Sequence, residues 1–165
     1  MVEKGGIAPV SFDGDVSGLP TWAFVVVIVG ALYLILNVLS RTSGWTELAD
    51  HYGGASRLVG ARRRFQSLSM GRGGLMMMNI NNAAILTVTP SALEIAVFFP
   101  FNLTMKPLVI PFSDVTATIS KQMFMFTSVD LKTVRAEEII IRLSEGQARW
   151  IEQEAGAKLA YVDAA

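Results

Sequence analysis

The longest uninterrupted apolar stretch of the chain lies near its beginning. It runs from Trp22 to Leu39, eighteen residues of which twelve are Val, Ile, Leu or Phe and only Asn37 is strongly polar. At about 1.5 Å per residue, an α-helix of this length measures roughly 27 Å, which is close to the thickness of a hydrocarbon core. The pattern predicts one transmembrane α-helix over residues 21–40, with Trp22 as an aromatic anchor in the headgroup region.

Two other interpretations of this stretch are weaker. A core helix of a soluble protein normally has a polar face, and this stretch has none. A cleaved signal peptide begins with a cationic region and ends with a small-x-small site, and neither flanks the stretch. The preceding residues 1–20 contain four glycines and two prolines with little periodicity, which predicts a flexible tail.

A short amphipathic helix is expected directly after the span. Trp45, Leu48 and Tyr52 recur at helical spacing, so that they share one face. Ser43 is a candidate N-cap for this helix. We expect residues 41–60 to form this juxtamembrane helix and a linker, outside the globular domain. Trp45 is then a second candidate anchor at the membrane interface, because an indole suits the headgroup region.

From residue 61 onward the hydrophobic period changes to two. Short runs rich in β-branched, aromatic or methionine residues recur about every ten residues, which is typical of strands. Turn residues separate the runs, as at Gly71 to Gly74 and at Asn81-Asn82. The pattern predicts six to eight strands. Their short links favour an antiparallel sheet, barrel or sandwich over parallel βαβ units.

The chain is predicted to end in an amphipathic helix. Ser144 and Gln147 have the spacing of a capping box. Strands closed by one C-terminal helix are the layout of the pleckstrin-homology/GRAM (PH/GRAM) superfold. We therefore predict for residues 61–163 a mostly β (α+β) globular domain, either a small PH/GRAM-like barrel or a two-sheet sandwich, with the helix plugging one open end. The apolar positions at helical spacing are Ala148, Ile151, Ala155, Leu159 and Val162.

Composition excludes several classes of function. The 165 residues include 14 Lys+Arg and 14 Asp+Glu, for a formal net charge of +0, which argues against a dedicated nucleic-acid binder. The absence of cysteine excludes disulfides, thiolate metal sites and cysteine nucleophiles. The single histidine, His51, is expected at the surface. We assign no catalytic, cofactor-binding or metal-ligating residue.

The charges are distributed unevenly along the chain. Residues 41–80 carry six arginines and two acids, whereas residues 1–40 carry one base and three acids. The positive-inside rule therefore predicts a single-pass protein of the cell membrane, with an extracytoplasmic tail and a cytoplasmic C-terminal domain. A glycosylation sequon, Asn102-Leu103-Thr104, would require the opposite orientation, but a three-residue pattern is common by chance.

The arginines that follow the span are candidate contacts to anionic lipids. A cationic side chain near the cytoplasmic leaflet attracts anionic headgroups by about 1 kcal/mol. Alternatively, these arginines serve only as a topology signal during insertion, and the two interpretations are compatible. The candidates are Arg57, Arg62, Arg63, Arg64 and Arg72.

Three segments in combination resemble a known group of proteins. They are GWTELADHY at 44–52, NINNAAILTV at 79–88 and PLVIPFSDV at 107–115. The combination resembles small, uncharacterised, single-span bacterial membrane proteins with a G-W-x-x-L-A-x-x-Y segment and a PH/GRAM-like β domain. Phe112 stands where that group would have Trp. The resemblance implies structural roles for these residues and carries over no activity.

The sequence favours a non-catalytic interaction module. One helix would anchor it in the lipid bilayer, and the β domain would meet a protein partner or anionic lipid. The alternative is an accessory subunit of a larger membrane complex, with strands rich in Met and Phe as its interface. A membrane-surface enzyme would need a cleft with convergent polar groups, and the sequence contains no such cluster.

Overall fold

The computed structural model of the chain describes residues 20–54, 58–73, 77–122 and 126–162. The predicted tail therefore lies outside the described residues except at Pro20, and so does Arg57. The chain divides into two compact units, residues 1–32 and residues 33–165. The helix α1 begins in the first unit and ends in the second.

Helix α1 (Thr21–Thr42) has 22 residues and contains the whole apolar stretch. It is long and apolar enough to cross a membrane, as predicted, and is the one helix of that kind in the described part of the chain. Trp22 is 69% exposed, and most of the large apolar side chains that follow it are exposed too. Arg41 lies in the last turn, where a cation suits the negative end of the helix dipole.

Helix α2 (Trp45–Tyr52) forms as predicted but belongs to the core of the second unit. Trp45 is fully buried and its Nε1 donates a hydrogen bond of 2.8 Å to the carbonyl of Lys106. The prediction that Trp45 lies at the membrane interface is therefore wrong. The apolar face of α2 packs against the sheet, so this helix is no linker outside the domain. The helix begins after Gly44 in a left-handed conformation (φ 79°), while the Ser43 hydroxyl accepts from the Trp45 amide at 3.4 Å.

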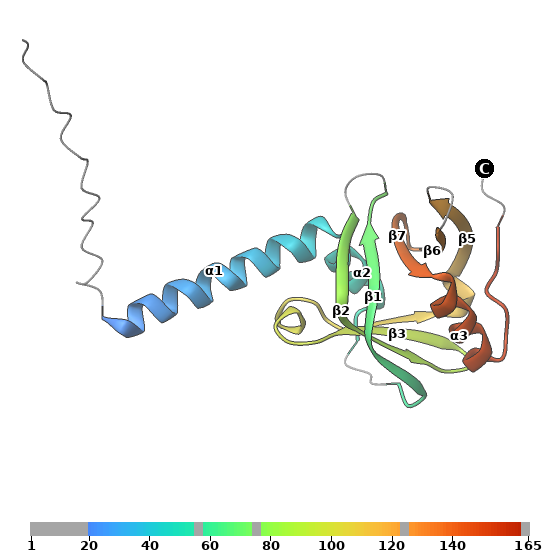
Figure 1. Cartoon of the computed structure of the whole chain (residues 1–165), viewed down its shortest axis with the longest axis horizontal. Helices are drawn as coiled ribbons and strands as arrows, with labels where there is room; N and C mark the ends of the chain where they lie inside the picture. The colour runs from blue at the N-terminus through green and yellow to red at the C-terminus, as the bar shows by residue number, and fades with distance from the viewer. Residues whose placement is uncertain (1–19, 55–57, 74–76, 123–125, 163–165) are drawn as a thin grey trace, which may run out of the picture. The chain divides into compact units, whose positions relative to one another are not determined.

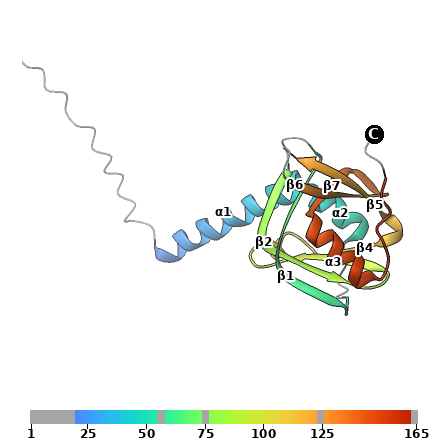
Figure 2. The same ribbon diagram turned by 45° about the vertical axis from the view of Figure 1, so that its right-hand side comes forward.

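Seven strands form one antiparallel sheet in the described residues, in the order β4-β3-β2-β1-β7-β6-β5. Two meanders, β1 to β4 and β5 to β7, join through a short β1–β7 ladder at Ser69–Gly71. Figures 1 and 2 show the sheet curling around helices α2 and α3. The strands are β1 (Ala61–Gly71), β2 (Met77–Val88), β3 (Ala92–Val97), β4 (Leu108–Pro111), β5 (Val115–Gln122), β6 (Phe126–Thr133) and β7 (Ala136–Ser144).

Two positions of the first hairpin depart from regular strand geometry. Asn81-Asn82 was expected to separate two strands, but β2 runs through it without ending. Asn82 has a φ of 52° and Phe65 a φ of 56°, and the β1–β2 register shifts between Arg63 and Gln66 and again before Leu68. Asparagine tolerates the left-handed region better than most residues, so the pair accommodates a bulge here instead of a turn.

Helix α3 (Glu145–Ala155) begins with the predicted capping box between Ser144 and Gln147. It ends earlier than the apolar spacing predicts, because Gly156 adopts the left-handed conformation (φ 68°) that terminates helices. The chain then turns back along β5. The Ala117 amide donates to the Ala160 carbonyl at 2.8 Å, and the Val162 amide donates to the Ala117 carbonyl at 2.9 Å.

Replacing the buried indole tests how strongly α2 is held in the domain. Trp45→Ala should lower the free energy of unfolding by about 3–5 kcal/mol, the usual cost of truncating a buried aromatic side chain. Urea unfolding of the full chain in mild detergent, followed by near-ultraviolet circular dichroism, measures this loss. Trp22→Ala is the matched control, since that side chain is exposed. An equal effect of the two substitutions would contradict the burial of Trp45.

Candidate membrane-contact site

The three consecutive arginines of β1 point in different directions. The Arg62 Nε donates to the Thr87 hydroxyl on β2 at 3.2 Å. The Arg63 guanidinium lies over the indole of Trp150 on α3, 4.6 Å from the ring centroid. Side chains alternate along a strand, so neighbouring arginines reach opposite faces of the sheet. Arg63 thus makes a cation–π contact with the helix, and Arg62 extends along the other face.

An exposed aromatic pair lies beside these arginines. Phe65 follows Arg64 at the bulge and is 65% exposed. Its ring stacks on Phe98 of the β3–β4 loop, with centroids 4.9 Å apart and an interplanar angle of 19°. This pair is not among the residues that the sequence predicts as functional. Its only sequence signal is the double phenylalanine at 98–99, and the stack depends on a bulge that the strand pattern does not indicate.

Arg72 lies near the opposite end of β1. Ten residues of strand at about 3.3 Å each put it up to roughly 33 Å from Arg62. Its Nη2 is 2.8 Å from Glu47 Oε2, and its Nε is 3.9 Å from Glu138 Oε2. The hydrogen bond to Glu47 and the charges of both acids raise the pKa of Arg72. Of the described candidates, Arg72 is therefore separated along β1 from the three consecutive arginines and is already paired with acids.

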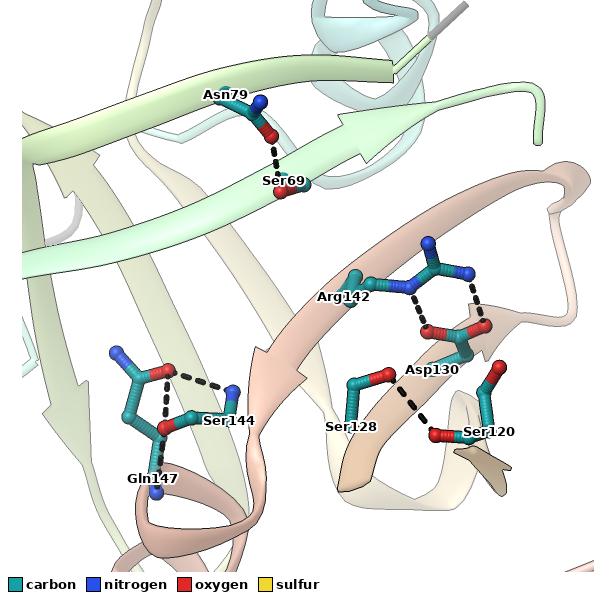
Figure 3. Close-up of polar contacts among 8 residues, drawn as sticks. All are labelled: Ser69, Asn79, Ser120, Ser128, Asp130, Arg142, Ser144 and Gln147. Carbon is teal, nitrogen blue, oxygen red and sulfur yellow. Dashed lines mark hydrogen bonds and ion pairs between the residues drawn. The ribbon is translucent and has the colours of Figure 1, made fainter. Parts of the chain in front are cut away.

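A pocket of about 220 Å³ opens where β1 and β7 part. Their ladder covers three residue pairs only, so the hydroxyl-bearing ends of the strands face a gap. The Gln147 side chain spans part of it, with its Nε2 donating to the Ser67 carbonyl at 3.0 Å and to Gln66 Oε1 at 3.1 Å. Figure 3 shows the polar residues around this gap. The pocket is lined by Ser67, Leu68, Ser69, Asn81, Thr127, Ser128, Arg142, Leu143 and Ser144.

The charged group of this pocket is neutralised within the protein. Arg142 donates from Nε and Nη2 to the two carboxylate oxygens of Asp130, at 2.6 and 2.8 Å. This hydrogen bonding raises the pKa of Arg142, although partial burial opposes the shift. Figure 3 shows the paired, bidentate geometry. The ion pair therefore supports the sheet rather than presenting a free cation to a ligand.

The serine hydroxyl groups of the pocket are also engaged. Ser69 bonds the Asn79 side chain, Ser128 donates to the Ser120 carbonyl at 3.1 Å, and Ser144 bonds Gln147. The lining residues contain no His, Glu or Lys that could act as a general base. His51 is exposed on α2, as predicted. Within the described ranges, no group of three His, Cys, Asp or Glu residues is placed to hold a metal ion.

Comparison of the chain with protein-family models, with curated proteins and with solved structures finds no match. The group that its segments resemble therefore stays a prediction. Two arginines of β1, the aromatic pair beside them and the exposed helix α1 are the features from which a function can be derived.

Removing one member of the buried ion pair tests its structural role. Arg142→Met should destabilise the domain by about 3 kcal/mol, because it leaves the Asp130 carboxylate uncompensated in a largely buried place. The double variant Asp130→Asn/Arg142→Met should lose clearly less. Urea unfolding of the full chain in detergent measures both losses, and equal losses would show that the pair does not act as a unit.

Proposed function

We propose that this protein is a membrane-anchored, non-catalytic interaction module that presents its β domain to anionic lipid at the cytoplasmic face of a cell membrane. The observation that carries the proposal is helix α1. Its apolar side chains are exposed along most of its length, from Trp22 to Val38. An exposed apolar surface of this extent far exceeds the few hundred Å² found on soluble monomers. A lipid environment accounts for it, because lipid chains solvate apolar side chains on every face of a helix.

The topology of the sheet supports a PH/GRAM-like domain. Two antiparallel meanders of four and three strands join at one ladder, and a helix follows the last strand. A run of antiparallel strands closed by one C-terminal helix is the layout that the strand pattern predicts for that superfold. We include in the proposal the likeness of the β domain to the PH/GRAM superfold and the relationship of the chain to single-span bacterial proteins.

The lipid contact rests on Arg62 and Arg64. Both are exposed on β1 and directly precede Phe65 of the stacked aromatic pair. Exposed guanidinium groups near an anionic surface gain about 1 kcal/mol each, screened over roughly 8–10 Å at physiological salt. Among the described residues, Arg62 donates only to a neutral hydroxyl, that of Thr87. Arg63 lies over an indole and Arg72 pairs with two carboxylates, so we assign these two smaller contributions. The non-enzymatic role is supported by a pocket in which most polar side chains are hydrogen-bonded within the protein.

Membrane extraction tests the anchor. The full chain should stay in the membrane pellet after alkaline carbonate treatment, because about eighteen apolar residues hold it in lipid. Val27→Arg/Ile28→Arg should shift much of the protein to the supernatant, since each arginine at a helix centre costs about 2.5–3.5 kcal/mol of insertion. Val134→Arg, at an exposed apolar position of the β6–β7 turn, is the control. Release of the unmodified chain would refute the anchor.

Lipid selectivity tests the basic contact. The full chain, reconstituted in bilayers, should prefer spin-labelled phosphatidylglycerol over phosphatidylcholine, as electron paramagnetic resonance of the motionally restricted lipid measures. Arg62→Gln/Arg64→Gln should reduce this preference several-fold, and added salt should reduce it further.

The control removes two charges from elsewhere on the domain. Arg135→Gln/Arg149→Gln changes the net charge equally, but these arginines already face Asp114 and Glu145. This double variant should keep most of the lipid preference. No preference in the unmodified chain, or an equal loss in both double variants, would reject the lipid contact.

A further inference from the structure

The loop between β3 and β4 is hydrogen-bonded to the last turns of α1. The Thr104 hydroxyl donates to the Leu36 carbonyl at 3.3 Å, and the Ser40 hydroxyl donates to the Thr104 carbonyl at 3.4 Å. All three residues belong to the second compact unit. Leu36 precedes Leu39, the end of the apolar stretch, by three residues, which is about 4.5 Å along a helix. The loop therefore meets α1 at a level that lies inside the apolar stretch.

The loop exposes two large apolar side chains, beside the exposed but uncharged Asn102. No charged residue occurs between Glu94 and Lys106. Phe99 is 73% exposed and Leu103 is 57% exposed. The stack of Phe65 on Phe98 extends this apolar surface onto β1. Large apolar side chains concentrated at one loop tip mark a contact with another apolar phase or partner.

The backbone of the loop is suited to a place with little water. Four consecutive amides, from Asn102 to Met105, donate to the carbonyls of Phe98, Pro100 and Phe101 at 3.0–3.3 Å. Pro100 itself has no amide proton. Backbone donors that are satisfied within the loop remove much of the cost of leaving water.

The two ends of the loop are fixed to the domain. The Phe98 amide donates to the Ala83 carbonyl at 2.8 Å, and the Lys106 carbonyl accepts from the buried Trp45 indole at 2.8 Å. The exposed tip is therefore held beside α1 by contacts to β2 and α2.

We propose that this loop inserts Phe99 and Leu103 into the lipid interface beside α1, as a second membrane contact of the protein. The inference rests on the proposed function, because it requires α1 to lie in the bilayer. If the apolar turns of α1 lie in lipid, the loop that is hydrogen-bonded to them lies at a similar depth in the membrane. The occupant of the apolar tip is then lipid at the boundary of headgroups and acyl chains.

The charge distribution around the loop fits this occupant. Arg62 and Arg64 directly precede Phe65 along β1, so that cations border the apolar surface on one side. Membrane segments that lie in the interface place aromatic and aliphatic side chains toward the acyl chains and cations among the headgroups. Lys106 closes the loop with a further exposed cation.

Site-directed labelling of the full chain tests the insertion directly. The protein contains no cysteine, so single variants can be labelled without removing native thiols. Phe99→Cys and Leu103→Cys are labelled with an environment-sensitive fluorophore and reconstituted in phosphatidylcholine/phosphatidylglycerol vesicles. Nitroxides on the acyl chains then quench fluorophores that reach the bilayer. Val38→Cys, on an exposed position of α1, reports the anchor, and Val134→Cys is a matched apolar position on the β6–β7 turn.

Shallow nitroxides should quench the labels at 99 and 103 at least about twofold more than the label at 134. Quenching at 38 without quenching at 99 and 103 would overturn the loop insertion and leave the membrane anchor intact. No quenching at 38 would overturn the anchor and the insertion together. Unchanged urea unfolding midpoints of the labelled variants establish that each domain is folded.

Discussion

The burial of the last turns of α1 and of helix α2 in the β domain is the constraint on which the other features depend. Leu36 and Trp45 are buried, and Leu39 packs against the same core. If a flexible linker joined the apolar helix to the domain, any face of the domain could turn toward the membrane. Here the helix ends within the core of the domain, so one loop and one end of β1 are selected. Under the proposed function, core packing thus decides which part of the domain faces lipid.

Much of the fold follows from local patterns in the sequence. The apolar stretch, the period of two and the Ser144–Gln147 capping box each act over a few residues, and the corresponding elements form where they are predicted. The place of Trp45 does not follow, because a short amphipathic helix suits a membrane surface and a protein core equally. Its burial depends on Lys106, a hydrogen-bond partner 61 residues away. Likewise, the end of α3 depends on the left-handed conformation of Gly156, while the apolar spacing continues beyond it.

From the sequence, the candidate site is predictable only as a segment rich in arginine, without the positions of its side chains. An arginine-rich segment after an apolar span indicates an anionic partner. Only arginines that no indole or carboxylate of the protein engages are available to that partner. Which ones are free depends on strand alternation and on distant residues, since Trp150 engages Arg63 and Glu47 engages Arg72. The aromatic tip requires a stack across 33 positions of the chain, which no local pattern encodes.

The conformation of Phe65 is difficult to explain by stability alone. A bulky residue with a φ of 56° occupies a sparsely populated region, at a cost of order 1–3 kcal/mol. The strain places the ring against Phe98, yet leaves most of the ring exposed to the surroundings. In water this arrangement exposes apolar area that a regular strand could bury. Beside a bilayer the same exposed ring transfers into an apolar phase, and the gain on transfer offsets the strain. Under the proposed lipid contact, the bulge belongs to the surface that faces the bilayer.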